Sequence, residues 1–407
     1  MKYVVVLADG MSDYPIAELG DKTPLEYAWT PNFDFLASQG IMGMVRTVPE
    51  GFSPGSDTAN LSALGYDPGK YYSGRSPFEA ASIGIPLELT DITFRCNVVT
   101  LSEDEPYEEK TIEDHSADEI STEEATELIR AVNEKFKTES LEFYPGFSYR
   151  HILVWHKAPH DYTLTPPHDI LTKKIGPYLP EGADGALLLA MMKESYDLLK
   201  DHPVNLKRKE QGLRPANSIW LWGEGRKPAL TGFEDKYKLK GSVISAVDLV
   251  RGIGVCSGME IVKVPGATGN VHTNYVGKAR AALDELARGQ DFVYIHVEAP
   301  DESGHRAELD NKVLSIERID EKVVGTLLAG LKGQDFRLMI LPDHPTPLSL
   351  RTHTAEPVPF VIYDSRKQTG GQDGRVFTED SAGATGIYVD KGHTLMDAFL
   401  LDGVLGD

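Results

Sequence analysis

Short apolar runs alternate along the chain with segments in which apolar residues recur every three or four positions. The runs predict strands, because strands that are buried on both faces read as continuous hydrophobic stretches. The predicted strands span residues 3–8, 152–156, 219–222, 259–264, 292–297, 337–341 and 358–363. The second pattern predicts amphipathic helices over residues 122–137, 183–200, 274–288 and 310–331. This alternation predicts an α/β fold with a mostly parallel sheet that helices cover on both faces.

The strands outside the middle of the chain form the most regular series. The middle portion instead contains an acidic run, many prolines and a basic patch at 206–212. We therefore interpret residues 73–214 as a smaller α+β domain inserted into a core formed by 1–72 and 215–407. A length of 407 residues agrees with two or three domains.

Composition narrows the classes of partner. A net charge of −21 argues against nucleic acid and against an anionic membrane surface. The run 103–124 holds eleven acidic residues and one lysine, which is typical of a solvated surface. Two cysteines form no disulfide framework, no apolar run could span a bilayer, and no signal-peptide pattern opens the chain. These features predict a cytoplasmic protein.

Acidic and histidine side chains follow or precede the core strands. Parallel strands end at a common edge of the sheet, which is where ligands bind in such folds. Each residue alone could be a turn former or a helix cap. Together, three carboxylates at one edge would repel each other unless cations lay between them, and mixed Asp/His ligands suit Mn²⁺ or Zn²⁺. Six such ligands favour two ions. The candidates are Asp9, Asp301, His305, Asp343, His344 and His353.

A nucleophile for such a site could come from the segment 53–68, where Ser56 precedes a predicted helix over 57–64. The N-terminus of a helix favours an alkoxide or a phosphate. Taken alone, Ser56 reads more simply as the N-cap of this helix, and Ser53, Thr58 and Ser62 compete with it. No phosphate-binding loop or dinucleotide fingerprint occurs, so we expect no nucleotide cofactor.

Several stretches, taken in order, resemble the cofactor-independent phosphoglycerate mutases of the archaeal type, within the alkaline phosphatase superfamily. They include "LADGMSD" (7–13), "GSDTANLSALGYDP" (55–68), "VPGATGNVHTNY" (264–275), "HVEAPDESGH" (296–305) and "DHPTP" (343–347). The resemblance implies an alkaline-phosphatase-like core with an inserted domain. It also implies interconversion of 3- and 2-phosphoglycerate in glycolysis and gluconeogenesis, on a small anionic phosphorylated substrate.

The resemblance further implies two divalent ions, Mn²⁺ before Zn²⁺, Mg²⁺ or Co²⁺. Ser56 would be the nucleophile that forms a phosphoserine intermediate, which reverses its interpretation as an N-cap. The inserted domain would close over the core and exclude water. One ion would be held by Asp301, His305 and His353, and the other by Asp9, Ser56, Asp343 and His344.

An anionic substrate needs cations, and arginine forks suit carboxylate and phosphate oxygens. Of the candidates we favour Arg95, Arg150 and Lys240, although each could equally form a structural ion pair. The full set of candidates is Arg75, Arg95, Arg150, His151, His160, Asp161 and Lys240.

One position departs from the family pattern. Glu298 stands where the related stretch carries lysine. This variant resembles a bacterial subgroup that has been proposed to act as homoserine kinases. Transfer to another acceptor such as homoserine, or to water, is therefore the alternative function. A metal-binding regulatory protein without catalysis is a third reading, which the presence of Ser56 and of the other ligand candidates disfavours.

Overall fold

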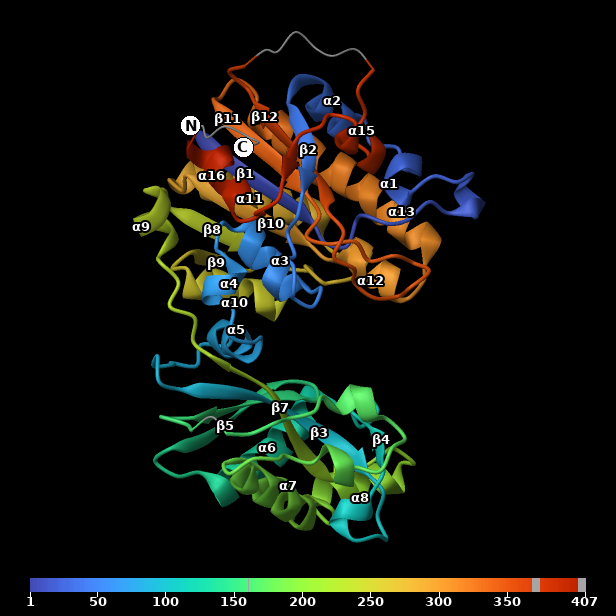
Figure 1. The fold of residues 1–407 in the computed structure, drawn as a ribbon, viewed down its shortest axis with the longest axis vertical. Coiled ribbons are helices and arrows are strands. Elements are labelled where there is room, and N and C mark those ends of the chain that lie inside the picture. Colours follow the sequence, from blue (N-terminus) through green and yellow to red (C-terminus); the bar gives the residue numbers. More distant parts are fainter. Residues whose placement is uncertain (160, 368–373, 402–407) are drawn as a thin grey trace. The chain divides into compact units, whose positions relative to one another are not determined.

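The computed structural model describes residues 1–159, 161–367 and 374–401 (Figure 1). The chain divides into two compact units, residues 1–72 with 229–407 and residues 73–228. The chain returns to the first unit at residue 229 and not at residue 215 as expected. The reason is that the strand Ser218–Arg226 pairs with the strand Ile92–Leu101 inside the second unit.

The first unit is built on an eight-stranded sheet in the order β13-β2-β12-β11-β1-β10-β8-β9. All strands run in one direction except β12, which is antiparallel to both of its neighbours. The prediction of an α/β fold with a mostly parallel sheet is confirmed. In chain order the strands are β1 (Lys2–Ala8), β2 (Ile41–Val45), β8 (Gly241–Ile244), β9 (Glu260–Val262), β10 (Phe292–Val297), β11 (Phe336–Leu341), β12 (Val358–Asp364) and β13 (Tyr388–Val389).

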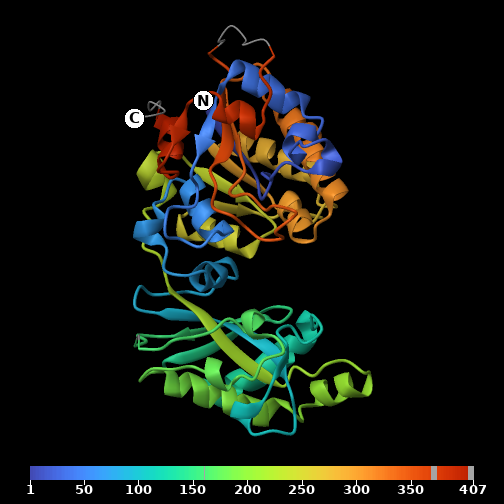
Figure 2. The same cartoon turned by 45° about the vertical axis from the view of Figure 1, so that its right-hand side comes forward.

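Helices cover both faces of this sheet (Figures 1 and 2). Alternate side chains of β1 point to opposite faces: Val4 and Val6 pack with Ala279 and Ile316, whereas the ring of Tyr3 contacts Phe399. The helices of this unit are α1 (Pro24–Tyr27), α2 (Pro31–Gln39), α3 (Ser56–Ala63), α4 (Pro68–Tyr71), α9 (Phe233–Tyr237), α10 (Asp248–Cys256), α11 (Tyr275–Arg288), α12 (Ala299–His305), α13 (Leu309–Arg318), α14 (Gly325–Gly330), α15 (Glu379–Gly383) and α16 (Thr394–Leu401).

Several elements of this unit differ from expectation. The helix predicted over 310–331 is interrupted by a π-helical segment, Ile319–Val324. The sequence analysis also missed β2, a short strand whose Gly43 lowers its strand propensity. A Cβ at Gly43 would lie 2.7 Å from the carbonyl oxygen of Ile387, so the glycine permits the neighbouring chain to approach.

The second unit holds a five-stranded antiparallel sheet in which β3 pairs with β4, β6 and β7, and β5 pairs with β6. Its strands are β3 (Ile92–Leu101), β4 (Ile112–Asp114), β5 (Leu141–Phe147), β6 (Arg150–Trp155) and β7 (Ser218–Arg226). Its helices are α5 (Ser76–Ser82), α6 (Thr122–Phe136), α7 (Gly185–Leu199) and α8 (Pro203–Glu210).

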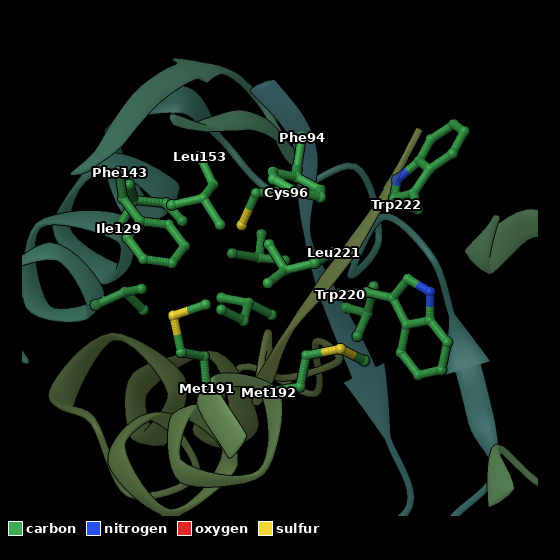
Figure 3. Packing of buried hydrophobic residues seen from close by; sticks show 14 of the residues in the cluster. Phe94, Cys96, Ile129, Phe143, Leu153, Met191, Met192, Trp220, Leu221 and Trp222 are labelled. Carbon is green, nitrogen blue, oxygen red and sulfur yellow. The ribbon is translucent and has the colours of Figure 1, made fainter. Parts of the chain in front are cut away.

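One face of this second sheet packs against α6 and α7. Figure 3 shows Phe94 and Cys96 of β3 in the same buried cluster as Ile129 of α6 and Met192 of α7. The opposite face carries Arg95, whose position inside a strand explains why the alternation in β3 escaped a search for continuous apolar runs. The unit therefore has its own hydrophobic core.

The acidic run is partly neutralised inside the second unit. Arg208 of α8 donates to Glu124 at 2.6 Å, and Arg214 lies 3.3 and 3.1 Å from the carboxylates of Asp114 and Asp118. Arg208 of the basic patch and Arg214 just beyond it thus pair with residues of the acidic run that are distant in sequence. Within the described residues, the chain contains no helix that is long and apolar enough to cross a membrane.

Candidate metal centre and nucleophile

The six expected ligands gather at the carboxyl edge of the first sheet. Asp9 follows β1, Asp301 and His305 lie on α12 after β10, and Asp343 with His344 follows β11. The register aligns these ends, since Ala8 pairs with Val297 and Leu7 with Leu341. His353 reaches the same edge because β12 runs in the opposite direction and therefore begins there.

The first cluster of ligand atoms involves Asp301, His305 and His353. The two carboxylate oxygens of Asp301 lie 3.3 Å from His353 Nε2 and 3.4 Å from His305 Nε2. The two Nε2 atoms are 2.9 Å apart. His305 Nδ1 lies 3.0 Å from the carbonyl oxygen of Arg351, which only a protonated Nδ1 can satisfy, so the lone pair of neutral His305 is on Nε2. The Asp301 carboxylate and the two Nε2 atoms therefore lie next to one another.

The second cluster involves Asp9, Asp343 and His344, all of them buried. Asp343 Oδ1 accepts the backbone N–H of Gly10 at 3.1 Å and that of His344 at 2.9 Å. Asp343 Oδ2 accepts the side-chain amide of Asn60 at 3.1 Å and lies 3.3 Å from His344 Nε2. These bonds hold the carboxylate in one orientation, as an ion-binding site requires.

His344 links the two clusters. Its ring centroid lies 4.0 Å from that of His353, and ligand atoms of Asp301, His344 and His353 lie within 4.8 Å of one another. Burial lowers the pKa of His344, which favours the neutral imidazole that metals bind.

The charges in this region are poorly balanced by the protein alone. Burial, with the neighbouring carboxylates of Asp343 and Asp301, raises the pKa of Asp9 well above its ordinary value. Burial acts in the same direction on Asp301, but its hydrogen bonds with His305 and His353 hold its pKa well below the ordinary value. The hydrogen bond with Asp301 raises the pKa of His305 to about 9. Cations between the carboxylates would allow all of them to ionise.

The donor set fits divalent metal ions. Asp9 Oδ1 is buried and has no hydrogen-bond partner within the described residues. In addition, the two imidazole nitrogens of His305 and His353 face each other, an arrangement that a shared ion would stabilise. A further group, Asp9, Glu298 and Asp301, also lies within 4.8 Å.

Ser56 is the first residue of α3, and its N-cap is Gly55. The interpretation of Ser56 as the N-cap is therefore wrong, because Gly55 occupies that position. Its hydroxyl lies 3.2 Å from His344 Nε2, beside both clusters. Of the competitors, Thr58 Oγ1 donates to the carbonyl of Gly55, and Ser62 is buried.

Several supporting residues were missed from the sequence. Asn60 donates to Asp343 and to the carbonyl of Ser56, and it accepts the hydroxyl of Tyr294 at 2.8 Å. Thr346 donates to Asp301 Oδ1 at 2.5 Å. His296, inside the apolar strand β10, contacts Asp9 at 2.8 Å. Of these residues, only His296 could have been noticed in the sequence, because it is a histidine within an otherwise apolar strand.

The cationic candidates of the second unit form a network around Glu79. Its two carboxylate oxygens accept Arg75 Nε at 2.8 Å and Arg95 Nε at 2.9 Å. The guanidinium of Arg95 also lies 4.3 Å from the ring centroid of Trp222. Arg150 is exposed and stacks on Tyr149.

Two other candidates make hydrogen bonds within the second unit. His151 is 2% exposed, and its Nδ1 accepts the N–H of Gly146. Asp161 accepts the N–H of Ala183 in the turn before α7. His151 is therefore held inside the fold, whereas Asp161 is exposed and stays a candidate for binding substrate.

Lys240 precedes β8, and its carbonyl accepts the N–H of Phe292, the first residue of β10. It therefore lies at the amino edge of the sheet, opposite the metal-ligand candidates. His160, another expected residue, lies outside the described residues.

Comparison with known proteins identifies the family. Residues 37–205 match the model of the 2,3-bisphosphoglycerate-independent phosphoglycerate mutase family. A probable 2,3-bisphosphoglycerate-independent phosphoglycerate mutase from Geobacter sulfurreducens is 49% identical over 98% of this chain and 100% of its own length. One such mutase from Methanothrix thermoacetophila is 47% identical over 97% of this chain and 98% of its own.

Solved structures agree with this assignment. A protein from Pyrococcus horikoshii is 30% identical, with a TM-score of 0.82 over 100% of this chain and 99% of its own. The fold is also that of a cofactor-independent phosphoglycerate mutase from Thermoplasma acidophilum, which is 26% identical with a TM-score of 0.68 over 99% and 100% of the two chains. The resemblance inferred from the motifs is confirmed: this chain belongs to the family of 2,3-bisphosphoglycerate-independent phosphoglycerate mutases, which are isomerases.

Proposed function

We propose that this protein interconverts 3-phosphoglycerate and 2-phosphoglycerate, without 2,3-bisphosphoglycerate, through a phosphoserine on Ser56. The observation that carries the proposal is the position of the Ser56 hydroxyl, 3.2 Å from His344 Nε2, where two clusters of metal-ligand candidates meet. The names of the relatives supply the substrate.

Two divalent ions, with Mn²⁺ the first choice and Zn²⁺, Mg²⁺ or Co²⁺ the others, complete the site. When bound, the ions would neutralise phosphoryl charge and lower the pKa of the serine hydroxyl. We assign Asp301, His305 and His353 to one ion, and Asp9, Ser56, Asp343 and His344 to the other.

The residues of the chain then have separate tasks. Ser56 Oγ attacks the phosphorus of 3-phosphoglycerate in line, so the Oγ–P bond forms while the bond from phosphorus to the 3-oxygen breaks. The proton that the released 3-oxygen takes up balances the proton that the Ser56 hydroxyl loses. The 2-hydroxyl of glycerate then loses its proton, attacks phosphoserine and restores Ser56. The backbone N–H groups at the start of α3 favour negative charge beside Ser56.

Arginines of the second unit are proposed to bind the anionic groups of the substrate. Arg95 is the best candidate, because Glu79 and the ring of Trp222 orient its guanidinium. Arg75 shares Glu79, and the exposed Arg150 adds positive charge. Water must stay away from the phosphoserine, or hydrolysis would compete with transfer. We place this reaction in the cytoplasm.

The test is direct. The protein is incubated with 3-phosphoglycerate and Mn²⁺ in the absence of nucleotide, and 2-phosphoglycerate is followed by coupling to enolase. We expect turnover, and we expect Ser56→Ala to abolish it while Mn²⁺ binding is retained. Ser62→Ala, on the same helix, is the matched control and should retain activity. Absence of product at every metal concentration would refute the mutase, and an active Ser56→Ala would remove Ser56 from the mechanism.

Glu298 supports the alternative function. Its carboxylate lies within 4.8 Å of ligand atoms of Asp9 and Asp301, so a negative charge adjoins the proposed phosphoryl site. That charge would disfavour an anionic acceptor such as glycerate and favour a neutral or cationic one. The alternative is a phosphotransferase that acts on another acceptor, in the manner of a homoserine kinase, or on water. Release of inorganic phosphate in the same assay would favour the hydrolase, and transfer of phosphate to homoserine in a separate assay with ATP as the donor would favour the kinase.

A further inference from the structure

A buried chain of hydrogen bonds lies behind the carboxylate of Asp9. His296 of β10 is 0% exposed, and its two ring nitrogens contact different partners. Its Nε2 lies 2.8 Å from Asp9 Oδ2, and its Nδ1 lies 3.1 Å from Ser245 Oγ at the end of β8. Three neighbouring strands of the sheet thus contribute one residue each to a continuous line of polar contacts.

The direction of these bonds follows from Ser245. Its hydroxyl oxygen accepts the backbone N–H of Val247 at 3.0 Å, so its own proton is available to a different acceptor. The carbonyl of Val247 is 3.5 Å away, whereas His296 Nδ1 is at 3.1 Å. The hydroxyl therefore donates to Nδ1, and the proton of neutral His296 is placed on Nε2.

This tautomer makes His296 a donor to Asp9. Its Nε2–H donates to Asp9 Oδ2, while Asp9 Oδ1 has no hydrogen-bond partner within the described residues and lies 3.8 Å from His344 Nε2. The two oxygens of one carboxylate are thus in different environments: one is held by the protein, and the other is presented to the ligand clusters.

The backbone around this histidine is also held in place. The ammonium of Lys278, on α11, is 0% exposed and donates to the carbonyl of His296 at 2.8 Å. The backbone N–H of Asp9 donates to the carbonyl of Val297 at 3.0 Å. The donor and the acceptor of the bond from His296 to Asp9 are therefore both fixed from the main chain.

We propose that His296 is a positioning residue that fixes the Asp9 carboxylate so that Oδ1 alone is presented to the metal ion, and that Ser245 sets the tautomer that makes this possible. The inference rests on the role of Asp9 as a metal ligand in the proposed function. Without the bond from His296, repulsion from the carboxylates of Asp343 and Asp301 would turn Asp9 away from the site.

The inference predicts graded effects on metal affinity. His296→Leu removes the donor, and we expect the affinity of one of two Mn²⁺ ions to fall about 10- to 100-fold, as is typical when the partner of a metal ligand is lost. His296→Gln places an amide N–H near the position of Nε2, so it should retain most of the affinity. Ser245→Ala removes the donor that keeps the proton of His296 on Nε2, so it should lower the Mn²⁺ affinity by an intermediate amount. Ser242→Ala, a buried serine on the same strand whose hydroxyl contacts Glu285, is the matched control and should leave Mn²⁺ affinity unchanged.

The measurement is a calorimetric titration of the metal-free full chain with Mn²⁺, without substrate, combined with circular dichroism to compare the folds. Unchanged binding of both ions by His296→Leu would overturn the inference. Equal losses in His296→Gln and His296→Leu would also overturn it, since the donor would then be irrelevant. A wild-type chain that binds two ions but makes no 2-phosphoglycerate would refute the proposed reaction and leave this inference intact.

Discussion

Replacing Lys312 by methionine would leave a buried carboxylate without its cationic partner. The ammonium of Lys312 on α13 is fully buried and donates to Asp13 Oδ2 at 2.6 Å and to the carbonyl of Thr346 at 2.8 Å. Asp13 also accepts the backbone N–H of Leu348. This pair therefore ties the segment after β1 to the loop that carries His344 at one end.

The size of the effect follows from this burial. Removal of one partner from a buried ion pair costs about 3–5 kcal/mol, because the other charge stays desolvated. For a unit of about 250 residues, 1 kcal/mol corresponds to roughly 2 °C in the unfolding temperature. We therefore expect Lys312→Met to lower the Tm of the metal-free protein by about 6–10 °C. Mn²⁺ affinity should fall as well, since Thr346 also donates to Asp301.

The double variant Asp13→Asn with Lys312→Met is the matched control. It removes both charges, so most of the lost stability should return. Thermal unfolding monitored by circular dichroism measures all four proteins of the cycle. A decrease of less than about 2 °C in the single variant, or an equal decrease in the double variant, would refute the argument that an unpaired buried charge causes the loss.

Other predictions concern the metals, an acid-sensitive ion pair and the arginine network. Chelation with EDTA should lower the Tm, because ions that bind only the folded state stabilise it, and an unchanged Tm would contradict the two-ion site. Arg366 and Arg337 hold the pKa of Asp364 below its ordinary value, although burial opposes them. The stabilisation is therefore complete above about pH 4 and is lost only as the pH falls towards the lowered pKa of the folded state, so Asp364→Asn should destabilise at pH 7, and the difference from the wild type should shrink progressively below pH 4. Arg95→Ala should raise the KM for phosphoglycerate at least tenfold, and unchanged kinetics would place the substrate pocket elsewhere.

The ligand candidates could be found from the sequence because strand ends are a local signal. Asp9 and Asp343 each follow a continuous apolar run, and parallel strands place such residues at one edge whatever the details of packing. The residues that hydrogen-bond to these ligands could not be predicted from the sequence. Asn60 contacts Asp343 across 283 positions of sequence, and nothing near either residue announces the contact.

The positions of two other candidates show the same limit. Lys240 and His151 were chosen for their chemistry and for their place in matching stretches. Lys240 precedes its strand and so lies at the amino edge, while His151 alternates with the exposed Arg150 and faces the core. A single step along a strand reverses the direction of the side chain. In β3 and β6 that choice depends on the face that α6 and α7 cover, which local sequence does not specify.

The sequence by itself determined the α/β class, the six ligand candidates and the family, because apolar runs, the residues that follow them and the order of motifs are properties of the chain alone. The tertiary structure decided which atoms of these residues are held by hydrogen bonds from the protein and which face the ligand clusters. Asp9 shows the difference, since His296 holds one of its oxygens while the other has no partner within the described residues. Such distinctions depend on hydrogen bonds between strands that are neighbours in space but hundreds of residues apart in sequence.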